Sequence, residues 1–143
     1  MKTIMCCLAL VALAMCTSAA FAQGPTLASV EAKFETTTDN KNPETKLDVY
    51  VKSRGGQDVA KSEGNEGLWD KHSTHIVTLE IEGNPTKAEV AHGSIVLTFH
   101  PRGGDTWKFN YKVTLKFSDG SFLIKDFHDC ALTNHDPSRT DSL

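Results

Sequence analysis

The segment WKFNYKVTLKF (residues 107–117) alternates without a break between apolar and polar side chains. Its odd-numbered positions hold only aromatic or aliphatic residues, whereas lysine, asparagine and threonine fill the even-numbered ones. Successive side chains of a β-strand point to opposite faces of a sheet. The segment therefore predicts a strand with one face in a hydrophobic core and the other in solvent.

A turn follows this strand at SDGS (residues 118–121). Asp-Gly is a favoured two-residue loop of β-hairpins. With that loop, Phe117 pairs with Phe122 and Leu115 pairs with Ile124. These pairs place the apolar residues of both strands on one face, so the predicted register is self-consistent.

Shorter alternating segments precede the hairpin, and turn-forming residues separate them. We expect strands at residues 29–36, 46–52, 75–82 and 94–100. A second hairpin is expected to join the last of these strands to Trp107 through residues 101–105. No helical periodicity follows residue 22. The pattern predicts an all-β fold, an antiparallel β-sandwich of about seven to eight strands.

The N-terminus has the features of a secretory signal. Lys2 precedes an apolar stretch over residues 4–15, and Ala20-Phe21-Ala22 provides a small-x-small cleavage site. The apolar stretch is too short to span a bilayer. We therefore expect residues 1–22 to be a signal peptide, residues 23–132 to be the sandwich domain, and residues 133–143 to be a loose polar tail. The mature protein would be exported, either periplasmic or secreted.

A second interpretation of the N-terminus is a lipoprotein anchored at Cys16. Lipoprotein processing usually requires a small residue before the cysteine, and Met15 is not small. Cleavage after Ala22 is therefore the preferred prediction.

The mature composition limits the possible partners. Cleavage leaves 121 residues, with 14 basic and 18 acidic side chains, a formal charge of −4. Nucleic-acid binding usually requires a basic excess, so this charge argues against it. Cys130 would be the only remaining cysteine, which excludes an intramolecular disulfide.

Three segments resemble the PLAT/LH2 (lipoxygenase-homology) β-sandwich family. They are Thr38-Asp39 with TKLDVYV (45–51) and Gly55-Gly56, then HGSIVLTFH (92–100), then GGDTW (103–107). The match covers roughly residues 30 to 117. The family commonly has an acidic residue where this chain has Pro101, and the hairpin after residue 117 lies outside the match. The resemblance implies a sandwich that binds lipids or proteins, in some members with calcium, and it does not imply an enzyme.

Two loops contain residues suited to calcium. Asp39, Asn40 and Asn42 share one loop, and Asp105 lies in another. Ca²⁺ requires several converging oxygen ligands. The competing interpretation is that Asp and Asn form ordinary turns here.

Histidines and the single mature cysteine suggest a metal site or a nucleophile. His72 lies close to His75, and His128 lies close to Cys130, with His135 nearby. Zn²⁺ needs three or four ligands, and a nucleophilic thiol needs a base beside it. A structural thiol with scattered surface histidines is the competing interpretation. A small exported enzyme using Cys130 with His128 or His135 remains the alternative function.

Lysines recur on the polar side of the 107–117 strand. Lys108, Lys112 and Lys116 are spaced four residues apart, and in the predicted hairpin register Lys125 lies opposite Thr114 on the same face. Leu123 and Phe127 are expected on this face too. Such a stripe suits an anionic lipid surface or an acidic protein partner, although lysines also protect strands from aggregation.

Together these features predict an exported, non-catalytic binding or interaction module for lipid or protein ligands. A structural envelope or assembly subunit is a further alternative. Neither catalytic residues nor a required cofactor follow from the sequence, and Ca²⁺ is the one cofactor that it suggests.

Overall fold

The computed structural model of the chain describes residues 24–143, so the predicted signal peptide and Cys16 lie outside the described residues. The described part contains eight strands and one short helix. Their bounds are β1 (Leu27–Thr36), β2 (Lys46–Lys52), β3 (Asp58–Asn65), β4 (Thr74–Ile81), α1 (Lys87–Val90), β5 (Ser94–His100), β6 (Thr106–Phe117), β7 (Phe122–Thr133) and β8 (Ser138–Ser142). Every strand pair is antiparallel, which confirms the predicted all-β antiparallel fold.

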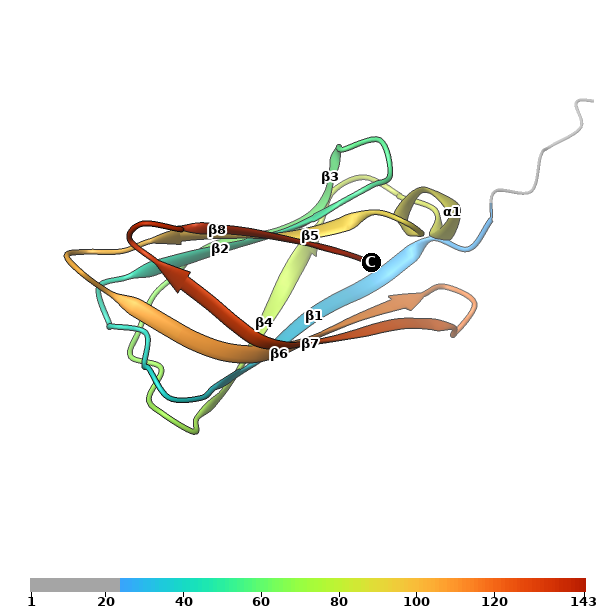
Figure 1. Cartoon of the computed structure of the whole chain (residues 1–143). Coiled ribbons are helices and arrows are strands. Elements are labelled where there is room, and N and C mark those ends of the chain that lie inside the picture. Colours follow the sequence, from blue (N-terminus) through green and yellow to red (C-terminus); the bar gives the residue numbers. More distant parts are fainter. Residues whose placement is uncertain (1–23) are drawn as a thin grey trace, which may run out of the picture.

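The strands follow the order β7-β6-β1-β4-β3-β2-β5-β8. Strands β7, β6, β1 and β4 form one layer, and β3, β2, β5 and β8 form the other (Figure 1). The layers are joined where β3 pairs with β4 through Ala60–Ile81 and Lys61–Glu80. β7 and β8 are therefore the two edge strands.

The core lies between the layers and is built around Phe34 of β1. All six apolar side chains predicted to face inward from β6 are buried. The ring centroids of Trp69, Trp107 and Tyr111 each lie 5.5 Å from that of Phe34, and the Phe109 centroid lies 5.8 Å away. Aromatic rings at such separations attract one another in addition to burying apolar surface.

The β6–β7 hairpin differs from the prediction by one residue. Its loop has three residues, because Gly120 adopts the left-handed conformation (φ 82°) and the Phe117 N–H bonds to the Ser121 carbonyl at 2.9 Å. Such a glycine allows a three-residue loop in place of a two-residue one.

The longer loop changes the strand register. Lys116 now pairs with Phe122, and Leu115 pairs with Leu123, so the predicted Phe117–Phe122 and Leu115–Ile124 pairs are wrong. A one-residue shift moves each side chain to the other face. Phe122 and Ile124 accordingly lie on the outer face, where they are 55% and 52% exposed.

The C-terminal segment is part of the sheet rather than a loose tail. β8 pairs with β5 along its whole length, and the Leu143 N–H bonds to the Gly93 carbonyl at 3.0 Å. The Leu143 side chain is buried. The predicted loose tail was inferred from the polar composition of residues 133–143. An edge strand can form from polar residues, because it is held mainly by backbone pairing.

The buried face of β6 yields a stability prediction. Phe109→Ala or Phe117→Ala should each lower the free energy of unfolding by about 3–5 kcal/mol, because both side chains are almost fully buried. Chemical denaturation of each variant measures this loss. A loss below about 1 kcal/mol at both positions would contradict the assigned core.

Candidate functional site

The predicted lysine stripe on β6 is largely neutralised by carboxylates. The Lys108 ammonium lies 3.0 Å from an Asp39 carboxylate oxygen, and Lys112 lies 3.2 Å from that of Asp126. Lys116 has no carboxylate within ion-pair distance among residues 24–143, and its ammonium lies 6.0 Å from the Phe122 ring centroid. Only Lys116 of these three is free to attract an external anion.

Lys125 does not join the stripe, and the prediction that it lies opposite Thr114 is wrong. It pairs with Val113 and faces inward with the half-buried side chains of Leu123 and Phe127. The one-residue hairpin shift is the cause, since Ile124 takes the position opposite Thr114. Lys125 remains close to the hairpin end, on the opposite side of β7 from Phe122.

The cations without carboxylate partners gather at one end of the sandwich. Of the 14 lysines and arginines after residue 23, eight lie within 4.0 Å of a carboxylate oxygen. One more, Lys41, is buried. The other five are Arg54, Lys71, Lys87, Lys116 and Lys125. Of these, Arg54 lies in the β2–β3 turn, Lys87 begins α1, and Lys116 and Lys125 lie in the strands that flank the β6–β7 loop.

Hydrogen bonds hold these three segments together. The Lys87 ammonium donates to the Ser121 hydroxyl at 2.9 Å, which joins α1 to the β6–β7 loop. The Arg54 N–H donates to the Glu89 carbonyl at 2.9 Å, which joins the β2–β3 turn to α1. We call this region the basic end and define it by Arg54, Lys87, Lys116 and Lys125 together with the exposed Phe122 and Ile124.

The nearby carboxylates are mostly engaged in local hydrogen bonds. Asp119 accepts from the N–H and hydroxyl of Ser121 at 2.9 and 2.6 Å, and Glu89 accepts from the N–H and hydroxyl of Thr86 at 2.6 and 2.8 Å. These bonds lower the pKa of both carboxyl groups, so both stay ionised. Glu31 lies on β1, two strands from Ile124. Glu89 and Asp119 are the only acidic residues in the β2–β3 turn, α1 and the β6–β7 loop themselves.

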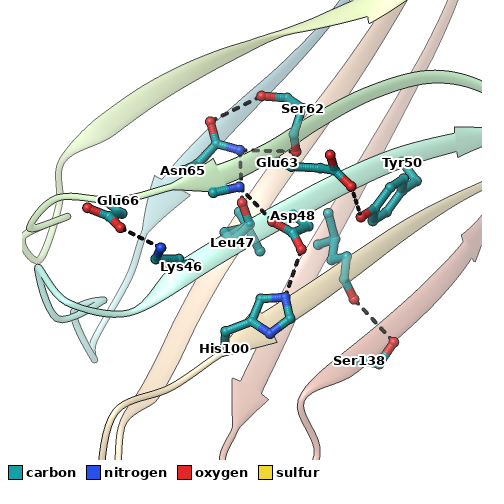
Figure 2. Close-up of polar contacts among 12 residues, drawn as sticks. Lys46, Leu47, Asp48, Tyr50, Ser62, Glu63, Asn65, Glu66, His100 and Ser138 are labelled. Atoms are coloured by element: carbon teal, nitrogen blue, oxygen red, sulfur yellow. Dashed lines mark hydrogen bonds and ion pairs between the residues drawn. The ribbon is translucent and has the colours of Figure 1, made fainter. Parts of the chain in front are cut away.

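The outer face of β2 contrasts with the basic end, because each of its outward side chains already has a polar partner. Figure 2 shows the partners of Lys46, Asp48 and Tyr50. His100 bonds to Asp48 at 2.7 Å, and the Tyr50 hydroxyl donates to Glu63 at 2.6 Å, which raises the pKa of Tyr50. The other pairs are Lys46–Glu66 at 3.0 Å and Lys52–Asp58. This face has little charge left for a partner.

Of the four residues of the predicted calcium site, the structure brings Asn42 and Asp105 into contact, and no cluster of oxygen ligands forms among the described residues. The Asp105 carboxylate is buried and accepts from the Thr45 hydroxyl at 2.7 Å and the Asn42 N–H at 3.1 Å. The Asn42 bond comes from its backbone N–H, and the Asn42 side chain itself is exposed. Asp39 pairs with Lys108 instead, and Asn40 is half-buried. Within residues 24–143 no group of three His, Cys, Asp or Glu is placed to hold a metal ion. The calcium site stays a prediction without support from this geometry.

A buried lysine, which sequence reasoning missed, lies beside that loop. Lys41 is fully buried, and its ammonium donates to the carbonyls of Thr45 and Gly67 at 2.7 and 2.8 Å. It also lies 4.9 Å from the Trp69 ring centroid. Burial lowers the pKa of Lys41 to about 8. The side chain ties the loop before β2 to the loop before β4.

Cys130 is not placed as a nucleophile. Its side chain is buried, and burial raises the pKa of the thiol to about 11, so it stays protonated. His128 lies exposed on the outer face beyond a bulge at Asp129 (φ 52°), and His135 lies in an exposed turn. The geometry gives no support to a Cys130–His128 or Cys130–His135 pair.

The second predicted histidine pair, His72 and His75, is not placed as a metal site. The His75 ring stacks on Trp69 with centroids 4.6 Å apart, and its Nε2 lies 3.0 Å from the Ser73 hydroxyl. His72 is exposed in a left-handed turn position (φ 62°). The two rings therefore have separate surroundings.

No family model and no curated protein matches this chain. The resemblance to the PLAT/LH2 family therefore stays a prediction. The only helix within residues 24–143 is α1, which is far too short to cross a membrane.

Lys41 yields a prediction on pH dependence. Its pKa is about 8 in the folded protein and 10.5 ordinarily, so the charged form costs folding free energy. That cost is fully present below about pH 8 and disappears as the pH rises toward 10.5. The stability of the wild type relative to Lys41→Met should therefore increase over this range, as measured by urea denaturation of both proteins. A difference that stays constant or falls would contradict the lowered pKa.

Proposed function

We propose that this chain is an exported, non-catalytic binding module that attaches to an acidic ligand surface through its basic end. The observation that carries the proposal is the gathering of four cations without carboxylate partners, Arg54, Lys87, Lys116 and Lys125, in a protein whose mature charge is negative. Export rests on the signal sequence over residues 1–22.

Ion pairing within the protein decides which lysines can bind an external anion. A lysine such as Lys112, already beside Asp126, gains little from an external anion because it must exchange one carboxylate for another. Lys116 has no such partner to give up. Each free cation near an anionic surface contributes about 1 kcal/mol at moderate ionic strength. Four cations acting together supply enough attraction for reversible binding.

The shape of the site also favours surface binding. The cations come from three separate segments, the β2–β3 turn, α1 and the β6–β7 hairpin, whose backbones lie toward one end of the molecule (Figure 1). Such an arrangement matches an extended anionic surface, because the four cations are spread over the end of the sandwich. The acid-rich remainder of the chain would face away from that surface.

A charge-matched pair of variants tests the proposal. The first changes Arg54, Lys87, Lys116 and Lys125 to glutamine. The second changes four ion-paired lysines, Lys33, Lys61, Lys108 and Lys112, to glutamine and has the same net charge. Binding is measured to phosphatidylglycerol vesicles and to poly-glutamate at low salt, and thermal unfolding verifies that both variants fold.

The first variant should lose most binding, whereas the second should keep most of it. Wild-type binding should weaken with added salt, because the Debye length falls to about 8 Å at physiological ionic strength. Equal losses in the two variants would show that net charge, and not the basic end, governs attachment. Absence of wild-type binding to both probes at low salt would overturn the proposal.

A further inference from the structure

We infer that the acidic ligand is the surface of a lipid bilayer, which the module meets end-on with Phe122 and Ile124 entering the headgroup layer. This inference rests on the proposed function and names the partner of the same site. It is drawn from the apolar side chains at the basic end and from the protected edge of β7.

The apolar side chains are the first observation. Only four large hydrophobic residues within residues 24–143 are exposed, and two of them, Phe122 and Ile124, are neighbours on the outer face of β7. Phe122 lies directly opposite Lys116 across the β6–β7 pair. A soluble polyanion would leave both side chains in water. The boundary between headgroups and acyl chains would bury them while the lysines contact lipid phosphates.

The edge of β7 argues against a protein strand as the partner. β7 is an edge strand with a free backbone edge, which could in principle accept an added strand. Its bulge at Asp129 and its inward-facing Lys125 are features that hinder edge-to-edge pairing. The apolar pair therefore fits a fluid surface better than an ordered strand partner.

The start of the sandwich lies at the same end. The Thr26 N–H donates to the Ser118 hydroxyl at 3.0 Å, and the Ser118 N–H donates to the Thr26 carbonyl at 2.8 Å. Figure 1 shows the β6–β7 hairpin, α1 and the beginning of β1 together at one end. An end-on contact would keep the paired polar face of β2 in water.

Tryptophan substitutions test insertion directly. Phe122→Trp places a probe in the proposed contact, and Ile76→Trp places one at an equally exposed apolar position on β4. The native tryptophans, Trp69 and Trp107, are buried and give a constant background. On phosphatidylglycerol vesicles, Phe122→Trp fluorescence should shift to the blue and be quenched by brominated lipids. Ile76→Trp fluorescence should change little.

A second variant separates lipid insertion from charge attraction. Phe122→Ser with Ile124→Ser should weaken partitioning into phosphatidylglycerol vesicles roughly tenfold, because the apolar contribution is lost. Binding to poly-glutamate should be unchanged, since the cations remain.

The outcomes distinguish the two proposals. Salt-sensitive binding to vesicles and poly-glutamate with no spectral shift in Phe122→Trp would overturn membrane insertion and leave an acidic protein as the partner. Equal shifts in Phe122→Trp and Ile76→Trp would overturn the end-on contact. Failure of the wild type to bind either probe would remove the proposed function, and this inference with it.

Discussion

Burial of the aromatic face of β6 against Phe34 is the constraint on which the rest of the structure depends. β6 lies between β1 and β7, so the direction of its side chains sets the inner and outer positions of both neighbours. Once Trp107, Phe109 and Tyr111 pack around Phe34, the lysines of β6 must point outward. The distribution of surface charge is thus a consequence of the core.

Both edge strands carry inward-facing charged side chains that oppose the addition of a further strand. β7 directs Lys125 inward, and β8 directs Arg139 and Asp141 toward the core side, where Asp141 accepts from the Tyr111 hydroxyl at 2.6 Å. Burial and this bond raise the pKa of Tyr111, so the phenol remains a donor. Inward charges at both edges oppose further strand addition. Strand addition is therefore a poor way to cover the exposed apolar side chains of β7.

Regular alternation made most strands predictable, and irregular features caused the errors. Residues 46–52 and 94–100 are strands with the predicted bounds. β3 was missed because its sequence, DVAKSEGN, buries only Val59 and Ala60 and carries no clear alternation. The hairpin register depended on the backbone conformation of Gly120, which Asp-Gly alone does not specify. Of the basic end, Lys116 and Lys125 were predicted, whereas Arg54 and Lys87 join it through contacts between segments distant in sequence.

Charge composition and spacing alone do not show which cations on this surface are free of carboxylate partners. The chain after residue 22 is acidic overall, and its regularly spaced lysines on β6 suggested a uniform basic stripe. Lys108 and Lys112 are instead removed from that stripe by ion pairs with Asp39 of the loop after β1 and Asp126 of β7. Of the cations without a carboxylate partner, Arg54 and Lys87 lie in a turn and a short helix, whereas Lys116 and Lys125 lie in strands opposite residues that carry no carboxylate. Four of the five cations that are neither buried nor paired with a carboxylate thus lie toward the end of the sandwich that also exposes Phe122 and Ile124, and the proposed contact with an anionic, partly apolar surface rests on that combination.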